Sequence, residues 1–239
     1  MTGNHSKLER VHRFFSGTGF SYDRVVAACT CGCDLYWKKK ILAKIPPHPR
    51  RILDQACGTG ILTLDIARRF PDSQVTGVEL RDEYLDIARE KARSAGTGNV
   101  RFVLGRAEDV MMEELDCITS SYLAKYAELD PLIANARDML RPGGVIVMHD
   151  FTYPANPAFR HCWQVYFHLM NMVGKRVYPE WRTVFEELPQ FLQQTSWLPE
   201  TLALLDEHGF CDISRESLTF GASAIVTARR PETPPNRTS

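Results

Sequence analysis

The chain has 239 residues, of which 44% are hydrophobic and 24% charged, as in a globular protein with one large α/β domain or two smaller ones. Its 29 Lys and Arg residues balance 29 Asp and Glu residues, which argues against nucleic acid as the main partner. No apolar run is long enough to span a bilayer, and the polar start Met1–His5 does not resemble a secretory signal. Together with seven scattered cysteines, these features predict a cytoplasmic protein with reduced thiols.

Residues 1–50 are expected to form an N-terminal helical cap. Leu8, Val11, Phe14 and Phe15 are spaced for one helix face. The glycine-containing segment 16–19 interrupts that helix, and a second apolar stretch runs over 22–45. The prolines in 46–49 end the cap, because consecutive prolines cannot continue a helix.

Strands and helices then alternate from residue 51 onward. Strands are expected at 51–54, 74–80, 100–104, 115–120 and 145–149, and helices at 61–70, 82–95 and 129–140. This alternation predicts an α/β domain over 51–230, with a Rossmann-like, mostly parallel sheet that carries helices on both faces.

The region 153–200 interrupts the alternation. It is rich in aromatic residues and proline, and we expect a helical insertion over the carboxyl edge of the sheet. An apolar stripe from Trp163 to Val173 predicts either a core-facing helix or a lid over an apolar acceptor. A helix at 201–208 and strands at 213–217 and 223–228 close the domain, and the polar tail 231–239 is expected to be disordered.

The most informative segment is the turn after the first strand. Asp54 ends that strand, and Gly58 and Gly60 allow the backbone to pass close to a ligand. Glu79 ends the next strand about 20 residues later, where an acid can accept hydrogen bonds from both ribose hydroxyls. These features fit either a dinucleotide or S-adenosylmethionine.

The residues around the glycines favour S-adenosylmethionine. A dinucleotide site needs a third glycine where this chain has Thr63. The carboxylate of Asp54 would repel a pyrophosphate, whereas it suits the cationic aminoacyl end of S-adenosylmethionine. With the later Arg141–Gly144 turn, the pattern over about 50–150 resembles class I S-adenosylmethionine-dependent methyltransferases.

The resemblance implies a set of cofactor-binding residues. Ala56 stands where the family usually has glycine, and Arg106 where it more often has Asp or Asn to meet the adenine amino group. The implied set is Asp54, Ala56, Gly58, Gly60, Glu79, Leu80, Arg106, Ala107, Glu108 and Ser120. No metal ligands are implied.

Two further segments resemble the ubiquinone/menaquinone biosynthesis C-methyltransferases. Tyr22, Asp23 and Trp37 match one signature of that family in residue type and spacing. The segments Leu140–Gly144 and His149–Thr152 match another, with His149 in place of an aliphatic residue. The resemblance implies C-methylation of a quinol-like or other apolar aromatic small molecule in quinone biosynthesis. It also allows a homodimer and a peripheral membrane contact.

Methyl transfer to an aromatic carbon requires an adjacent hydroxyl to lose its proton, and hence a base with a pKa near working pH. His149 ends the fifth strand, where ligands bind in open α/β sheets, and is the candidate base. Asp150 would orient it, and Tyr22 would donate to a substrate oxygen.

Cys29, Cys31 and Cys33 lie close enough in sequence to suggest a soft metal or arsenite, but no second cysteine pair accompanies them, and a buried helix or turn with small residues is the favoured interpretation. Methylation of O, N or arsenic in another small molecule is an alternative function. A non-catalytic protein that only binds S-adenosylmethionine is a second one.

Overall fold

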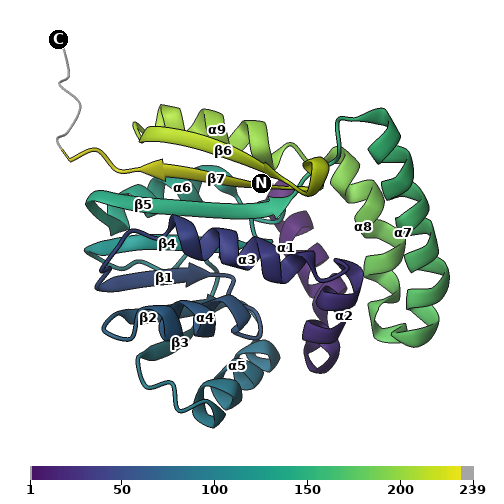
Figure 1. Cartoon of the computed structure of the whole chain (residues 1–239), viewed down its shortest axis with the longest axis horizontal. Helices are drawn as coiled ribbons and strands as arrows, with labels where there is room; N and C mark the ends of the chain where they lie inside the picture. Colours follow the sequence, from purple (N-terminus) through teal and green to yellow (C-terminus); the bar gives the residue numbers. More distant parts are fainter. Residues whose placement is uncertain (1, 233–239) are drawn as a thin grey trace.

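The computed structural model describes residues 2–232, with side chains from Lys7 onward; from residue 233, the expected disordered tail lies outside the described residues. Within this range the strands form one sheet in the order β3-β2-β1-β4-β5-β7-β6 (Figure 1). They are β1 (Arg51–Gln55), β2 (Gln74–Glu79), β3 (Val100–Leu104), β4 (Leu115–Ser121), β5 (Leu140–Phe151), β6 (Cys211–Leu218) and β7 (Ser223–Arg229). The first five are parallel, and β7 is antiparallel to both of its neighbours. The predicted Rossmann-like, mostly parallel α/β fold is confirmed.

Helices cover both faces of the sheet. On one face α3 (Cys33–Lys44) and α4 (Ile61–Arg69) pack over Ile52 and Val147. On the other, α6 (Leu129–Met139) and α9 (Trp197–Glu207) pack over Leu53 and Ile146. A further helix, α5 (Asp82–Ser94), lies against β2 and β3. Because both faces are covered, β1 and β4 are buried along nearly their whole length rather than at alternate residues.

The order of the strands places a crevice beside β1 and β4. From β1 the chain moves outward to β2 and β3, whereas from β4 it moves the other way to β5. Ligands of open α/β sheets bind at the carboxyl ends of the strands where this reversal occurs. The turn after β1, with its glycines, is therefore at the expected position of a ligand site.

The fifth strand is longer than the expected 145–149. The Arg141–Gly144 segment, expected as a turn, lies inside β5 at an irregularity in its pairing with β4. A Cβ on Gly144 would come within 2.9 Å of the carbonyl oxygen of Leu115, so only glycine allows this approach.

The two helical regions outside the sheet share one core. The N-terminal region contains α1 (Thr2–Phe15), α2 (Tyr22–Cys29) and α3, and the region after β5 contains α7 (Pro157–Val177) and α8 (Arg182–Gln194). In Figure 1, α7 and α8 lie side by side beyond the end of β5, next to α2. Phe14, Val25 and Trp181 are buried together with two residues of α8. The predicted boundaries of cap and insertion stay predictions.

Short 3₁₀ turns at Gly19–Ser21 and Pro179–Trp181 join these helices, and a third at Thr219–Gly221 joins β6 to β7. Asn156 caps α7 by accepting from the backbone N–H groups of Ala158 and Phe159, and Pro157 occupies the first helical position. None of the helices within residues 2–232 combines the length and the apolar character needed to cross a bilayer.

Candidate active site

The turn between β1 and α4 has a backbone that glycine favours. Ala56, Gly58 and Gly60 have φ values of 54°, 58° and 82°, all in the left-handed region. This explains why the resembling family usually has glycine at the position of Ala56. A Cβ on Gly60 would lie 3.0 Å from the Cβ of Ala88 on α5, whereas one on Gly58 would lie 3.9 Å from Tyr22. Gly60 therefore allows close packing against α5, whereas Gly58 faces open space next to Tyr22.

Asp54 is held below this turn by two hydroxyl groups. The Oγ1 atoms of Thr63 and Thr119 donate to its two carboxylate oxygens at 2.6 Å and 2.8 Å. Burial raises the pKa of Asp54 to about 6, and the two threonine hydroxyls oppose that rise. Thr63, which replaces the third glycine of a dinucleotide site, thus orients the acid that distinguishes this site.

Glu79 is oriented by backbone N–H groups at the end of β2. Its Oε2 accepts from Gly58 at 2.9 Å, and its Oε1 accepts from Arg81 at 3.0 Å. Burial raises the pKa of Glu79 above its usual value, and these N–H groups oppose the rise. Each oxygen keeps lone-pair capacity for a ribose hydroxyl.

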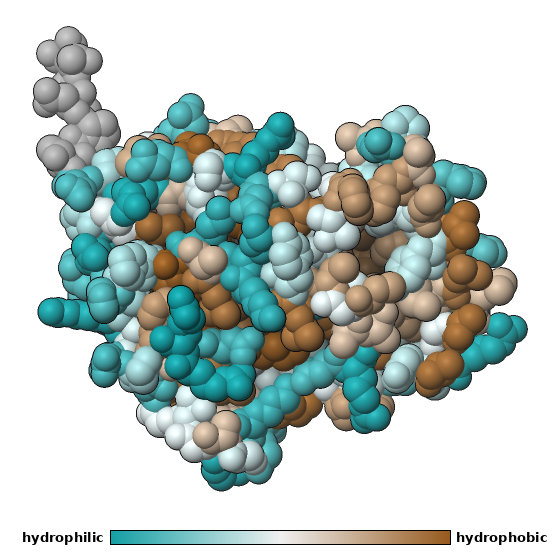
Figure 2. Space-filling model, in the orientation of Figure 1, coloured by the Kyte–Doolittle hydropathy of each residue, from teal (hydrophilic) through white to brown (hydrophobic). Residues whose placement is uncertain are grey.

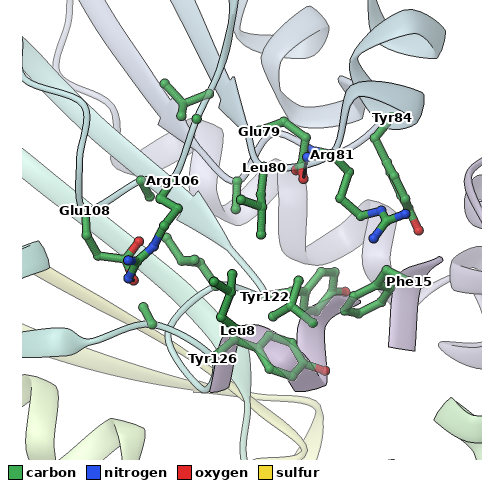
Figure 3. Close-up of a pocket in the computed structure, with 18 of the residues that line it drawn as sticks. Leu8, Phe15, Glu79, Leu80, Arg81, Tyr84, Arg106, Glu108, Tyr122 and Tyr126 are labelled. Carbon is green, nitrogen blue, oxygen red and sulfur yellow. Dashed lines mark hydrogen bonds and ion pairs between the residues drawn. The ribbon is translucent and has the colours of Figure 1, made fainter. Parts of the chain in front are cut away.

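A cavity of about 880 Å³, counting the space open to solvent, extends from Glu79 to Glu108. Figure 3 shows Glu79 and Leu80 on one side, Tyr122 and Tyr126 on another, and Glu108 at one end. Of the residues predicted to bind the cofactor, those that line it are Ala56, Gly58, Glu79, Leu80, Arg106, Ala107 and Glu108. On its aromatic side the sequence pointed to Tyr22 alone and missed Phe15 of α1, Tyr84 of α5, and Tyr122 and Tyr126 of the loop after β4.

The remaining predicted residues lie around this cavity. Asp54 lines a smaller adjoining recess with Ala56 and Gly58. Ser120 is buried, does not line either space, and its hydroxyl has no hydrogen-bond partner among the described residues. Arg106 lies 3.6 Å from Glu108, and both line the end where an adenine is expected.

Lys38 on α3 is a cation in the smaller recess that the sequence did not reveal. Its side chain is 7% exposed and forms an ion pair with Asp34, whose Oδ1 also accepts from the hydroxyl of Tyr122 at 2.8 Å. It lines the recess together with Asp54 and Gly58. The recess therefore offers both an anion and a cation, as the ammonium and carboxylate of an amino acid require.

A second cavity, of about 710 Å³ counting open space, adjoins the first and is apolar. Four aromatic residues line both cavities: Phe15, Tyr22, Tyr122 and Tyr126. Its other walls come from α2, α7 and α8, and include Val25, Met170 and Phe185. Among the described residues that line it, Lys125 is the one charged side chain.

The signature residues Tyr22, Asp23 and Trp37 connect the helical cap to these cavities. Asp23 accepts from the hydroxyl of Thr59 in the glycine turn and pairs with Lys91 of α5. Trp37 is buried on the sheet and donates through Nε1 to Thr219 at 2.8 Å. Tyr22 lines both cavities, and burial raises the pKa of its phenol well above the usual value. Tyr22 therefore remains a candidate donor rather than a base.

His149 does not occupy the position expected of a base. Its side chain is 0% exposed, and its Nδ1 and Nε2 lie 3.0 Å and 2.6 Å from the hydroxyls of Ser121 and Ser223. Burial lowers the pKa of the imidazole well below its usual value. With both nitrogens engaged and no exposed surface, this histidine has no contact with either cavity, and we correct its expected role to a structural one.

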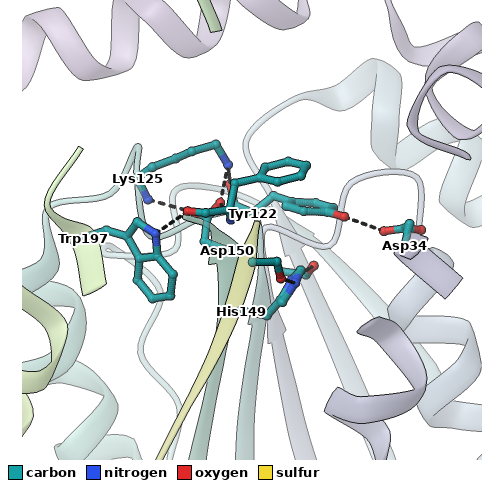
Figure 4. Close-up of polar contacts among 9 residues, drawn as sticks. Asp34, Tyr122, Lys125, His149, Asp150 and Trp197 are labelled. Carbon is teal, nitrogen blue, oxygen red and sulfur yellow. Dashed lines mark hydrogen bonds and ion pairs between the residues drawn. The ribbon is translucent and has the colours of Figure 1, made fainter. Parts of the chain in front are cut away.

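Asp150 does not orient His149 either. Successive side chains of a strand point to opposite faces, and Asp150 lies on the face away from the imidazole (Figure 4). Its Oδ1 accepts from the Nζ of Lys125 at 2.6 Å, and its Oδ2 accepts from the backbone N–H of Lys125 at 3.0 Å. The acid therefore belongs to a buried ion pair beside the second cavity.

The closely spaced cysteines do not gather into a metal site. Cys29 lines the second cavity, and burial raises the pKa of its thiol to about 11. Cys31 is exposed and Cys33 is half-buried. Over the residues whose side chains are described, no group of three or more His, Cys, Asp or Glu is placed to hold a metal ion.

Known proteins are similar to this chain in sequence and in fold. The ubiE/COQ5 methyltransferase family matches residues 3–230. The demethylmenaquinone methyltransferase of Staphylococcus aureus (strain JH9) is 25% identical over 230 residues, which are 94% of this chain and 95% of that protein.

Two solved structures show the same fold. Geranyl diphosphate C-methyltransferase from Streptomyces coelicolor A3(2) has a TM-score of 0.58 and 16% identity over 82% of this chain and 79% of that one. Haemonchus contortus phosphoethanolamine N-methyltransferase 2 has a TM-score of 0.62 and 17% identity over 82% of this chain. This chain covers 52% of that longer structure.

The match to the family extends over nearly the whole chain, and the polar groups of the first cavity and the adjoining recess fit its cofactor. Asp54 and Lys38 suit the aminoacyl group, Glu79 suits the ribose, and aromatic faces suit a sulfonium. The chain belongs to the ubiE/COQ5 methyltransferase family and is an S-adenosylmethionine-dependent methyltransferase.

Proposed function

We propose that the enzyme methylates a carbon atom of an apolar aromatic acceptor, quinol-like in having a hydroxyl next to the reacting carbon. The observation that carries this proposal is the apolar second cavity, which shares four aromatic residues with the cofactor cavity. A ring held in the second cavity would lie across this aromatic wall from the cofactor. The name of the Staphylococcus aureus relative supports the same class of acceptor.

The cofactor, when bound, would supply a sulfonium methyl group that a nucleophile attacks in line, with a thioether as the leaving group. The protein contributes alignment and exclusion of water, which together lower the barrier by about 7–11 kcal/mol at best. Tyr22, Tyr122 and Tyr126 present aromatic faces toward the boundary between the cavities, where they stabilise a cation and exclude water.

The acceptor must first lose its hydroxyl proton to solvent. The ring carbon beside the resulting oxyanion then forms the new C–C bond, while the C–S bond breaks and its electron pair stays on sulfur. The hydrogen on that ring carbon leaves as a proton when the ring regains aromaticity. The net change replaces one ring hydrogen by methyl and releases one proton.

Isotope-labelled S-adenosylmethionine and a panel of acceptors test the proposal. The panel holds a water-soluble naphthoquinol, a simple phenol, phosphoethanolamine and arsenite, and the product is analysed by mass spectrometry and NMR. We expect a new C–methyl group on the naphthoquinol. Methyl transfer only to O, N or arsenic, or binding of cofactor without any transfer, would overturn the assignment in favour of one of the alternatives.

A matched pair of variants locates the acceptor. Met170→Trp on α7 fills the second cavity, so turnover should fall at least tenfold while S-adenosylhomocysteine still binds. Leu169→Trp places the same bulk on the exposed side of the same helix, where Leu169 is 46% exposed, and should have little effect. Equal turnover in both variants would mean that the acceptor binds elsewhere.

We further propose a cytoplasmic enzyme whose α7 contacts a membrane surface or a second subunit. Apolar side chains follow the outer edge of this helix in Figure 2, and the exposed ones are Val165, Leu169, Met172, Val173 and Val177. Vesicle co-sedimentation and sedimentation velocity distinguish these two contacts.

A further inference from the structure

Lys125 is the one charged residue among the described residues that line the second cavity, which we call the acceptor cavity because we place the methyl acceptor there. Its side chain is held in one position. Its side chain is 2% exposed, and its Nζ donates to Asp150 at 2.6 Å and to the carbonyl of Tyr122 at 2.9 Å (Figure 4). Both oxygens of Asp150 are hydrogen-bonded, since the carboxylate also accepts from the backbone N–H groups of Lys125 and Phe151. The carboxylate is therefore held in place and fixes the lysine.

The same Nζ lies among aromatic rings that line the acceptor cavity. It is 4.5 Å from the ring centre of Tyr126, 5.3 Å from that of Tyr122 and 5.4 Å from that of Phe151. An ammonium carries three protons, and the described residues provide hydrogen-bond acceptors for two of them. One N–H group thus remains for an acceptor atom supplied by a ligand of the cavity.

We propose that Lys125 binds the hydroxyl oxygen of the methyl acceptor and stabilises it as an oxyanion, with Asp150 as a positioning residue. This inference rests on the proposed function and narrows the acceptor to phenols, naphthols and related enols. An apolar ligand without an ionisable hydroxyl would leave the remaining N–H of a buried ammonium unpaired, which is unfavourable. Binding releases the hydroxyl proton to solvent, and the lysine stays protonated throughout.

The environment makes such an oxyanion contact strong. The cavity walls are apolar, so the attraction between an ammonium and a phenolate is weakly screened there. Burial also lowers the pKa of Lys125, although Asp150 opposes this, so the ammonium gains from a second anionic neighbour. A preorganised donor aimed at an oxyanion accelerates a reaction by about 10²–10³-fold.

The pKa of a bound chromophoric phenol tests the assignment directly. 4-Nitrophenol is titrated with S-adenosylhomocysteine present and protein in excess, and the visible absorbance of its phenolate is followed. With wild-type protein we expect the pKa of bound nitrophenol to fall by about one unit or more below that of the free probe, equivalent to a factor of about ten in the ionisation constant. Lys125→Met should abolish this shift, and turnover of a naphthol should fall by about two to three orders of magnitude.

Two further variants keep the outcome interpretable. Removing Lys125 alone leaves Asp150 buried without its partner, so the double variant Lys125→Met with Asp150→Asn removes both charges if the single variant fails to fold. Lys40→Met removes an exposed lysine paired with Glu216 on the far side of α3, and should retain the full shift.

The assignment and the proposed function fail in different ways. If nitrophenol has the same pKa when bound to wild-type protein and to the double variant, Lys125 does not hold the oxyanion. The proposal of an apolar aromatic acceptor would still stand. If wild-type protein binds no phenol or naphthol at all, the proposed acceptor class is wrong, and the role of Lys125 with it.

Discussion

Glu79 accepts a hydrogen bond from the backbone N–H of Gly58 at 2.9 Å, which joins the end of β2 to the turn after β1 in the wall of the cofactor cavity. This contact orients the carboxylate before any ligand arrives, and it explains why the glycine and the acid about 20 residues apart work together. Because the backbone N–H of Arg81 occupies the other oxygen, an amide would turn its NH2 group toward one of the two N–H donors, so the geometry selects a carboxylate.

Glu79→Gln should therefore weaken cofactor binding by about 1–3 kcal/mol, since it replaces one acceptor oxygen by a donor and removes the charge from the ribose contact. Isothermal calorimetry with S-adenosylhomocysteine measures this. Glu90→Gln, on the exposed side of α5 and paired with Arg93, is the control and should bind as wild type. Unchanged affinity in Glu79→Gln would remove this acid from the cofactor site.

Cofactor affinity should fall at acid pH because of Asp54. The pKa of this buried carboxyl is about 6, and its ionised form suits the ammonium of the ligand. Below that pKa the fraction of the protein with an ionised Asp54 decreases, so the apparent Kd for the cofactor should rise by about tenfold for each pH unit. Titrations between pH 5 and 8 test this, and Asp54→Asn should show weak binding with a flat profile. A wild-type profile that is equally flat would mean that Asp54 does not titrate in this range.

Protein stability should change in the opposite direction at the same group. The pKa of Asp54 is raised on folding, so its proton stabilises the fold fully below about pH 4, and this stabilisation is lost as pH rises through about 6. The free energy of unfolding of the wild type, relative to that of Asp54→Asn, should therefore be lower at pH 7 than at pH 4 by on the order of 2–3 kcal/mol. Urea unfolding at the two pH values measures this difference.

The sequence predicted the sheet and the cofactor turn because both follow from local patterns. Alternating strands and helices give the order of the elements, and Asp54, Gly58 and Glu79 lie at fixed separations along the chain. Lys38 and Lys125 could not be predicted in this way, because their significance depends on which cavity wall they reach after folding. Strand alternation alone, by contrast, could have shown that Asp150 cannot orient His149.

Lys38 should recognise the carboxylate of the cofactor. It is a buried cation in the recess that also contains Asp54. Lys38→Met should weaken S-adenosylhomocysteine binding by about tenfold or more, the worth of a hydrogen bond between charged groups. It should not weaken binding of 5′-methylthioadenosine, which lacks the amino acid group.

Comparing the two ligands separates recognition from damage to the fold. An equal loss for both ligands would indicate a structural role for the pair of Lys38 with Asp34. Lys38→Arg keeps the charge and should restore part of the S-adenosylhomocysteine affinity. Full affinity of Lys38→Met for both ligands would exclude the contact.

His149 should contribute to stability more than to turnover. Its imidazole is completely buried and lies within hydrogen-bond distance of Ser121 and Ser223, so His149→Ala removes two hydrogen bonds and leaves a cavity. The free energy of unfolding should fall by about 2–4 kcal/mol.

The stability of the wild type should also depend on pH through His149. Because burial depresses the pKa of this histidine in the folded protein, the unfolded chain binds the proton first, and wild-type stability should decline as pH falls below about 6.5, the ordinary pKa of histidine. His149→Ala should lack that part of the decline, whereas His208→Ala, whose histidine is partly exposed just after α9, should keep it. Urea unfolding from pH 5 to 8 measures these slopes, and turnover per folded molecule is followed with the same acceptor. A well-folded His149→Ala enzyme whose turnover dropped by about two to four orders of magnitude, with loss of an acidic limb in its pH profile, would instead establish the histidine as the base.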